Sequence, residues 1–193
     1  MSGSPVEIVE FDVRPGSIDG LLVVTPKQVS DGRGTVREVF RRSAFDSAGI
    51  DVAVFRQINL TESRAGVVRG MHAEDMTKLL TVAWGRALGA YVDLRPGSTS
   101  FGTVETVDLE PGVQVLVPAG VANGFQALVD GCQYAYCFDD EWRPDMPGRS
   151  CSPFGLGFDW PVPVDPGDRT MVSAKDAAAP PLARLVAEQD LRR

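Results

Sequence analysis

Histidine and cysteine are scarce in this sequence, which limits the metal sites that it could build. There is one histidine, His72, and there are three cysteines, Cys132, Cys137 and Cys151, with no Cys-x-x-Cys pair. A zinc site usually draws several Cys or His ligands at short, regular spacings. An odd number of cysteines, with none in the first 131 residues, is also untypical of a disulfide framework. We therefore expect no metal site and no disulfide scaffold.

Positive charge and long apolar runs are also in short supply. The chain has 19 Lys and Arg against 26 Asp and Glu, a net charge of −7. Nucleic acids and anionic membranes bind basic surfaces, so we expect neither as a partner. No apolar stretch approaches the roughly 18 residues that cross a bilayer, and the start of the chain lacks the pattern of a secretory signal. With unpaired cysteines, these absences predict a cytoplasmic protein.

Turn-forming residues are abundant, with 20 Gly and 14 Pro among 193 residues. They separate short apolar runs at intervals of roughly 8–12 residues, a pattern typical of a β-sandwich or barrel. A turn is expected at Asp31–Gly34. Strands are expected at residues 21–24, 35–40, 52–60, 78–83, 86–94, 102–108, 114–117, 124–128 and 132–138.

Helical patterns are few. A short helical turn is expected at Ser43–Ala48 with Ser43 as its cap. A helical spacing of apolar residues predicts a short amphipathic helix within a C-terminal tail, residues 180–193. These residues are Leu182, Leu185, Val186 and Leu191. The gaps between strands are too short for a parallel α/β fold. We expect one all-β domain over residues 1–193, with residues 1–20 as an N-terminal arm outside the core.

The chemistry cannot be decided from residue spacing alone. No Gly-x-Ser-x-Gly motif supports a serine hydrolase, and no glycine fingerprint supports a Rossmann or P-loop enzyme. His72 has Arg69 three residues before it and Lys78 six residues after it, and such a cationic neighbourhood would suit a phosphorylated substrate that develops an oxyanion. A structural histidine is the commoner case. Spacing therefore leaves open a sugar-binding module or a metal-free enzyme.

Several motifs, taken together and in order from about residue 20 to 185, carry a family resemblance. The sequence resembles the dTDP-4-dehydrorhamnose 3,5-epimerases. The matching segments are Asp31–Gly34, Glu38, Gln57 with Asn59, Arg69-Gly70-Met71-His72, Lys78-Leu79-Leu80, residues 92–102 (VDLRPGSTSFG), residues 117–125 (VPAGVANGF), residues 157–161 (GFDWP) and residues 172–180 (VSAKDAAAP).

The resemblance implies a cupin-type jelly roll, a homodimer, no cofactor and a nucleotide-linked 4-keto-6-deoxy sugar as substrate. It implies removal of a proton beside the ketone and its return on the opposite face of the ring. The implied catalytic residues are His72 as base, Asp176 as its partner, Lys78 near the keto oxygen and Tyr136 as acid. Such a set suits the chemistry, because an enolate forms only where its charge is stabilised as it develops.

The resemblance also implies a set of substrate-binding residues. Arg69 matches a phosphate contact, and Arg33 and Glu38 are implied to act across the dimer interface, since the family exchanges N-terminal strands. Gln57, Asn59 and Asn123 match positions that bind the nucleotide and sugar, and Phe40 and Trp142 are candidates for stacking on a ring.

The sequence departs from the family pattern at several positions, and these departures are expected to reshape the sugar pocket. Asn123 stands where the family usually has histidine, and Glu141-Trp142 replaces a pair of tyrosines. An amide can hydrogen-bond a hydroxyl but does not act as an acid or base near neutral pH. Two alternatives therefore stay open: a single-centre epimerase or ketoisomerase on a related keto-sugar nucleotide, including a heptose, and a non-catalytic protein that binds sugar nucleotides.

Overall fold

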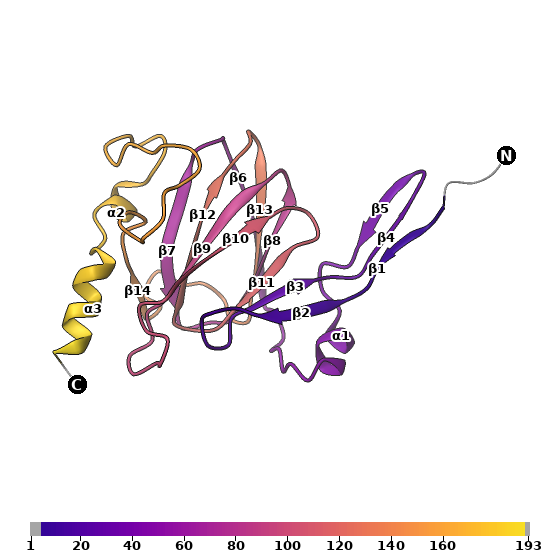
Figure 1. Cartoon of the computed structure of the whole chain (residues 1–193), viewed down its shortest axis with the longest axis horizontal. Helices are drawn as coiled ribbons and strands as arrows, with labels where there is room; N and C mark the ends of the chain where they lie inside the picture. Colours follow the sequence, from indigo (N-terminus) through magenta and orange to yellow (C-terminus); the bar gives the residue numbers. More distant parts are fainter. Residues whose placement is uncertain (1–4, 192–193) are drawn as a thin grey trace.

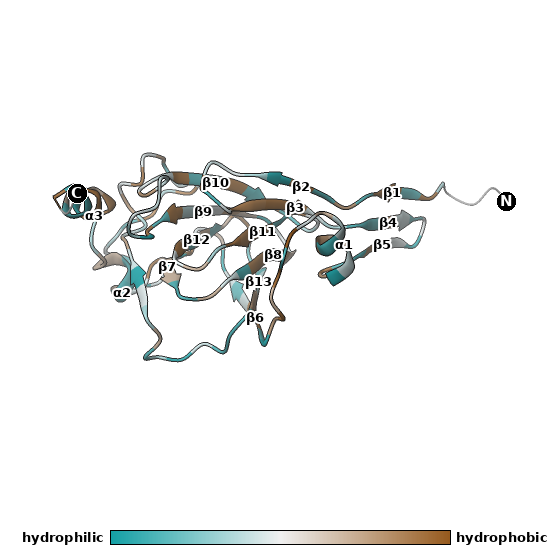
Figure 2. Ribbon diagram, turned by 90° about the horizontal axis from the view of Figure 1, so that it is seen from below, coloured by the Kyte–Doolittle hydropathy of each residue, from teal (hydrophilic) through white to brown (hydrophobic). Residues whose placement is uncertain are grey.

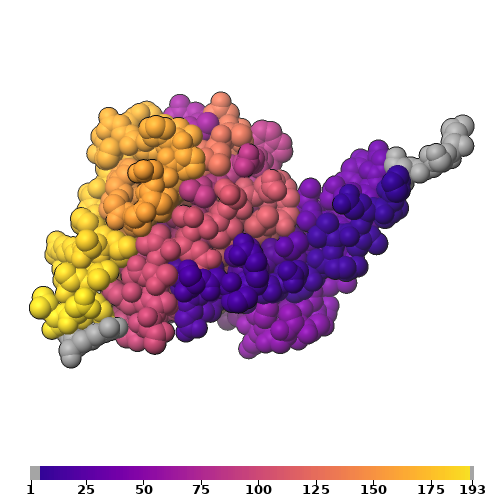
Figure 3. All heavy atoms as spheres, viewed as in Figure 1, coloured from indigo at the N-terminus to yellow at the C-terminus, as the bar shows by residue number. Residues whose placement is uncertain are grey.

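The computed structural model describes residues 5–191, which form an antiparallel β-sandwich with an arm at one end and a helix at the other (Figure 1). One sheet has five strands in the order β10-β9-β12-β7-β14, and the other has six in the order β2-β3-β11-β8-β13-β6. A third sheet, β1-β4-β5, forms the arm, which projects from the body as a narrow extension (Figure 3). The predicted all-β sandwich with a short C-terminal helix is confirmed.

The elements follow one another in this order along the chain: β1 Glu7–Val9, β2 Asp12–Pro15, β3 Leu22–Thr25, β4 Gln28–Asp31, β5 Gly34–Arg37, α1 Arg42–Ser47, β6 Gln57–Ser63, β7 Val68–Glu74, β8 Lys78–Trp84, β9 Ala87–Asp93, β10 Val104–Leu109, β11 Gln114–Val117, β12 Val121–Ala127, β13 Cys132–Phe138, β14 Gly148–Ser150, α2 Ala174–Ala177 and α3 Leu182–Asp190.

The core lies between the two large sheets. Tyr91 and Phe125 from the five-stranded sheet meet Leu80 and Tyr134 from the six-stranded sheet, and the Phe125 and Tyr134 rings stack with their centroids 4.0 Å apart. The outer faces are also covered: α1 packs Phe45 against the six-stranded sheet, and the C-terminal segment packs on the five-stranded sheet. A strand buried on both faces reads as a continuous apolar run, as Figure 2 shows for β3.

Three sequence predictions need correction. The cap of α1 is not Ser43, because the helix begins at Arg42 and its N-cap residue, Arg41, makes no side-chain capping bond. The strand expected from residue 52 begins at Gln57, since Val52 packs with Phe45 beneath α1 instead of pairing. The N-terminal segment is not all outside the core: it contains β1 and β2, and Ile18 is buried in the main cluster.

Strands β7 and β14 were not predicted from the apolar pattern. The register of β7 against β12 shifts between Asn123 and Phe125, at the point where Gly70 faces Gly124. A Cβ on Gly70, whose φ is +119°, would lie 2.5 Å from the Gly124 Cα. Glycine at both positions therefore lets the two backbones approach at a distance that no side chain would permit.

None of the helices within residues 5–191 combines the length and the apolar character that a bilayer crossing requires.

Candidate active site

A cavity of about 400 Å³ opens between the two large sheets and is bordered by the segment that contains α2. This volume is in the range of small-molecule sites. It is lined by Asn59, Thr61, Arg69, Gly70, His72, Glu74, Lys78, Asn123, Tyr136, Phe138, Trp142, Ser173, Lys175 and Asp176. Eight of the twelve candidate residues are therefore brought together: His72, Asp176, Lys78, Tyr136, Arg69, Asn59, Asn123 and the stacking candidate Trp142.

Strand β7 supplies two of the positively chargeable groups. Residues three apart on a regular strand point to opposite faces, yet Arg69 and His72 both line the cavity. The irregularity at Gly70 accounts for this, because it interrupts the alternation between them. Arg69 donates from Nε to the Ser63 hydroxyl at 3.0 Å, which holds the guanidinium against β6.

His72 and Asp176 form a close pair across 104 residues of sequence. The His72 Nε2 lies 2.6 Å from Asp176 Oδ1, and the backbone N–H of Gly70 donates to Asp176 Oδ2 at 3.5 Å. Burial raises the pKa of the Asp176 carboxyl, but the hydrogen bond and charge of His72, together with Ser173 and the Gly70 backbone, outweigh burial and bring the pKa below its ordinary value. An ionised Asp176 accepts a hydrogen bond from the protonated Nε2 of His72. The other ring nitrogen, Nδ1, is therefore the atom that can take up a proton from a substrate.

A helix terminus holds Asp176 in place. Ser173 is the N-cap of α2, and its hydroxyl accepts from the backbone N–H of Asp176 at 3.0 Å. The aspartate is therefore not itself the cap of this short helix, and its carboxylate is free to bond His72. Asp176 is buried, with 8% of its side chain exposed.

Lys78 begins β8 and its ammonium is almost fully buried, with 3% of the side chain exposed. Nζ donates to Asn123 Oδ1 at 2.6 Å, to the His72 carbonyl oxygen at 3.2 Å and to the Glu74 carboxylate. Burial lowers the pKa of Lys78, while the Glu74 carboxylate acts in the opposite direction. The Lys78 ammonium therefore faces the cavity, and its protonation depends on the groups that accept its hydrogen bonds.

Tyr136 reaches the cavity from β13, in the six-stranded sheet, whereas His72 belongs to the five-stranded sheet. The Tyr136 ring packs between Tyr134 and Phe138, with centroids 4.9 Å and 5.7 Å away. Burial raises the pKa of the phenol well above its ordinary value, despite the nearby Arg69. A neutral phenol and an imidazole thus face one cavity from opposite sheets, which suits proton donation and proton removal on two sides of a bound ring.

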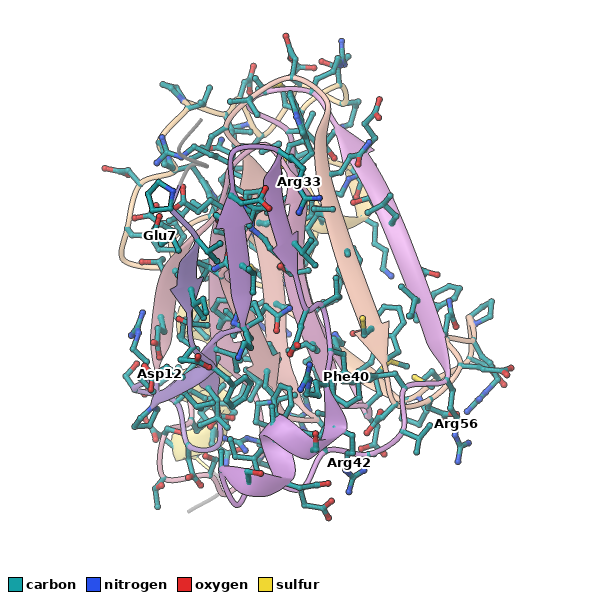
Figure 4. The ribbon with its side chains drawn as sticks, turned by 90° about the vertical axis from the view of Figure 1, so that its right-hand side faces the viewer. Glu7, Asp12, Arg33, Phe40, Arg42 and Arg56 are labelled. Carbon is teal, nitrogen blue, oxygen red and sulfur yellow. The ribbon has the colours of Figure 1, made fainter. Side chains whose placement is uncertain are left out.

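Three predicted binding residues lie outside the cavity lining, as does the stacking candidate Phe40, which packs against Phe45 and Phe55 instead. Gln57 is near its rim, where it donates to Asn59 Oδ1 at 2.9 Å and accepts from the Trp142 backbone at 2.7 Å. Arg33 lies at the tip of the β4–β5 hairpin (Figure 4), with 91% of its side chain exposed and an ion pair to Asp31. Glu38 follows β5 and pairs with Arg41.

Sequence reasoning missed several lining residues, above all Glu74. Glu74 is two residues after His72 on the same strand and four before Lys78, so alternation from His72 could have placed it on the cavity face. Thr61, Ser173 and Lys175 left no comparable signal. Within residues 5–191, no three His, Cys, Asp or Glu side chains gather as metal ligands would.

Comparison with known proteins places this geometry in context. The family model described as dTDP-4-dehydrorhamnose 3,5-epimerase matches residues 15–184. A dTDP-4-dehydrorhamnose 3,5-epimerase of Methanothermobacter thermautotrophicus is 32% identical over 181 residues, covering 91% of this chain and 96% of the relative. A dTDP-4-dehydro-6-deoxyglucose 3-epimerase of a Streptomyces species is 32% identical over 180 residues, covering 89% of each chain.

Solved structures are similar over nearly the whole chain. NovW, a 4-keto-6-deoxy sugar epimerase of Streptomyces spheroides, superposes with a TM-score of 0.82 at 28% identity, covering 93% of this chain and 92% of that one. The epimerase of Legionella pneumophila, solved with dTDP-4-keto-L-rhamnose, gives 0.79 at 32% identity, covering 93% and 97%. ChmJ, a 3'-monoepimerase of Streptomyces bikiniensis solved with dTDP-quinovose, gives 0.78 at 29% identity, covering 93% and 98%.

Proposed function

The chain belongs to the dTDP-4-dehydrorhamnose 3,5-epimerase family, and from this premise we propose how its residues carry out the reaction. The protein is an isomerase with the cupin-type fold of that family, and it epimerises dTDP-linked 4-keto-6-deoxy sugars at carbon 3, carbon 5 or both. His72 is the base, Asp176 its partner, Lys78 the group that stabilises the enolate and Tyr136 the acid.

The proposed steps balance within these four residues. His72 removes the proton from a carbon beside the ketone. The electron pair of that C–H bond forms the C=C bond of the enolate, and the π pair of the C=O bond moves to the keto oxygen. Lys78 stabilises the developing oxyanion, as pre-placed positive charge does in such sites. Tyr136 then donates its proton to the same carbon from the opposite face, and exchange with solvent returns the imidazolium and phenolate to their starting forms.

One observation carries the proposal: a carboxylate-paired imidazole and a partly buried phenol, on opposite sheets, line the same cavity as a buried ammonium. The His72 Nε2 to Asp176 Oδ1 distance of 2.6 Å fixes the ring, and the ionised carboxylate favours the imidazolium that forms on proton transfer. A protein that only binds a sugar nucleotide has no need of this set of acid and base.

The test is incubation with a dTDP-4-keto-6-deoxyglucose in deuterated water, followed by proton NMR. Wild-type protein should place deuterium on the ring, and His72→Asn should abolish that exchange because the amide is no base. Exchange by His72→Asn at the wild-type rate would remove His72 as the base. Tight binding without exchange by the wild type would instead support a non-catalytic binding protein.

The same spectra separate a double from a single epimerase. Deuterium at carbons 3 and 5 indicates inversion at both centres, and deuterium at one carbon indicates one. The second candidate, a 3-epimerase, is favoured by the similarity to the Streptomyces 3-epimerases and by Asn123, which stands where the resemblance expects histidine.

The partner that we propose is a second copy of this chain. The arm leaves Ile8 and Val36 exposed, and β6, at the edge of the six-stranded sheet, leaves Ile58 and Leu60 exposed. An exposed apolar edge strand is prone to pairing with another chain. In the proposed homodimer these surfaces cover one another, and Arg33 and Glu38 of one copy approach the cavity of the other.

Sedimentation equilibrium tests the dimer. The full chain should sediment as a dimer, and Ile58→Asp should shift it toward monomer because a carboxylate would be buried at the contact. Arg33→Ala should raise KM in the dimer. A monomeric wild type would overturn the assignment. We also propose that residues 1–193 form one domain that acts in the cytoplasm, supported by the three cysteines, all unpaired within the described residues.

A further inference from the structure

The hydrogen bonds around Lys78 account for all three protons of its ammonium group. The acceptors are the Asn123 amide oxygen at 2.6 Å, the His72 carbonyl oxygen at 3.2 Å and a Glu74 carboxylate oxygen. Two of these acceptors are neutral, and Glu74 is the charged one. Within residues 5–191, Glu74 is the carboxylate that forms an ion pair with Lys78.

The other chargeable groups facing the cavity do not replace Glu74. On β7, Arg69 adds positive charge, and the imidazole of His72 is engaged by Asp176 of α2 at 2.6 Å. On β13, Tyr136 is a neutral phenol whose pKa burial raises. Lys175, beside Asp176, is a further cation at the lining. Without Glu74, the Lys78 ammonium would be buried among neutral acceptors and like charges, an arrangement in which amines lose their proton.

We propose that Glu74 is a positioning residue of this epimerase, whose carboxylate holds the Lys78 side chain against the cavity and keeps it protonated for the stabilisation of the enolate. The inference rests on the proposed role of Lys78. Of the three acceptors, the His72 carbonyl is fixed in the backbone and Glu74 is held by charge. The Asn123 amide is neutral and on a rotatable side chain, so it is the acceptor that a keto oxygen displaces.

The balance of charge explains why a carboxylate beside the catalytic lysine is useful. Glu74 offsets part of the positive charge that the enolate meets, yet a neutral amine would offer the oxyanion no charge at all. Burial lowers the pKa of Lys78 and Glu74 opposes that effect. Replacing Glu74 by an uncharged residue leaves burial unopposed, so the lysine should lose its proton at lower pH.

The lysine can be observed directly, because the chain has three lysines, Lys27, Lys78 and Lys175. Protein labelled with carbon-13 at lysine Cε should give three signals, and Lys78→Met identifies that of Lys78. In Glu74→Gln its titration midpoint should fall by about one to three pH units, the effect of removing an adjacent opposite charge. Glu74→Asp, which keeps the charge, should titrate near the wild type.

A matched control is Glu62→Gln, which removes an exposed carboxylate from β6 outside the cavity lining. It should leave the Lys78 midpoint unchanged. An unchanged midpoint in Glu74→Gln would overturn the inference. Because this titration needs no substrate, it is decided independently of whether the protein epimerises a dTDP-sugar.

Two further measurements complete the test. If Lys78 must be charged, kcat falls as pH rises through its transition, so the alkaline limb should move to lower pH in Glu74→Gln; a limb that stays in place would overturn the inference. If Glu74→Gln does not fold, the double variant that combines Lys78→Met with Glu74→Gln tests the inference. Removal of the buried cation should also remove the need for the carboxylate. Recovery of folding supports the inference, and failure to fold overturns it.

Discussion

Replacing Asp176 by asparagine tests the pairing on which the proposed mechanism depends. The carboxylate has two acceptor oxygens, one 2.6 Å from His72 Nε2 and the other 3.5 Å from the Gly70 backbone nitrogen. An amide has one oxygen and one NH₂ group. If the oxygen faces Gly70, the NH₂ faces His72 and makes Nε2 an acceptor, so the wrong ring nitrogen carries the proton.

The opposite orientation of the amide is also unfavourable. If the oxygen faces His72, the NH₂ meets the Gly70 N–H, and two donors face each other. In either orientation the imidazolium loses its counter-charge. Acid–base catalysis contributes about 10²–10⁴-fold, and we expect Asp176→Asn to lose most of that factor in kcat.

The fold should survive this change, because the backbone N–H of residue 176 still donates to the Ser173 hydroxyl that caps α2. The assay is the rate of deuterium uptake at carbons 3 and 5, with thermal unfolding measured in parallel. Asp159→Asn, at an exposed loop position, is the matched control and should keep the wild-type rate. A loss smaller than about tenfold, or ~1.4 kcal/mol, would refute the reasoning.

Three more predictions concern other parts of the molecule. Tyr136→Phe should still take up deuterium from solvent but invert the ring carbon about 10²–10⁴-fold more slowly, as NMR of the product would reveal. Burial raises the pKa of Asp93, but hydrogen bonds from Arg95 and two serine hydroxyls lower it from 3.8 to about 2. This depressed pKa contributes about 2 kcal/mol to the free energy of unfolding above pH 4, and the contribution is lost as the pH falls toward 2. Asp93→Asn should therefore lower the free energy of unfolding in urea at pH 7 and make it less dependent on pH in the acid range. Gly70→Ala should destabilise the fold by about 2–5 kcal/mol, because backbone strain at positive φ adds to a clash with β12. Gly97→Ala has a positive φ but open space around it, so thermal melts should show a loss of about 1 kcal/mol.

Much of the sandwich was predictable because turn residues bound its strands, so that each strand is recognisable from a short stretch of sequence. The expected strands at residues 114–117 and 132–138 match β11 and β13 residue for residue. Strand β7 was harder, since its alternation breaks at Gly70 and its seven residues include charged groups that face a cavity. The start of β6 was misplaced because Val52 is apolar for contact with α1 and not for strand pairing.

The site residues divide in the same way. His72 and Lys78 were predicted through short motifs of the family resemblance, and Tyr136 through the alignment of its strand with the family. Glu74 was passed over because an acidic residue on a strand usually faces solvent, and its partner's burial is invisible in the sequence. Arg33 and Glu38 lie away from the cavity of their own chain, so the binding role predicted for them requires the second copy that we propose.

The amino-acid sequence alone determined the local features of this protein: short strands, the turns between them, the C-terminal helix and the residue types from which a metal-free proton transfer could be built. These depend on neighbours within a few residues of one another. The family resemblance implied that Asp176 is the partner of His72, but no local pattern placed the two side chains 2.6 Å apart. Tertiary structure alone decided that Arg69 and His72 face one cavity and that Glu74 forms an ion pair with a buried Lys78. Contacts of this kind form because two sheets pack and exclude water, and no local pattern encodes which distant side chains that packing brings together.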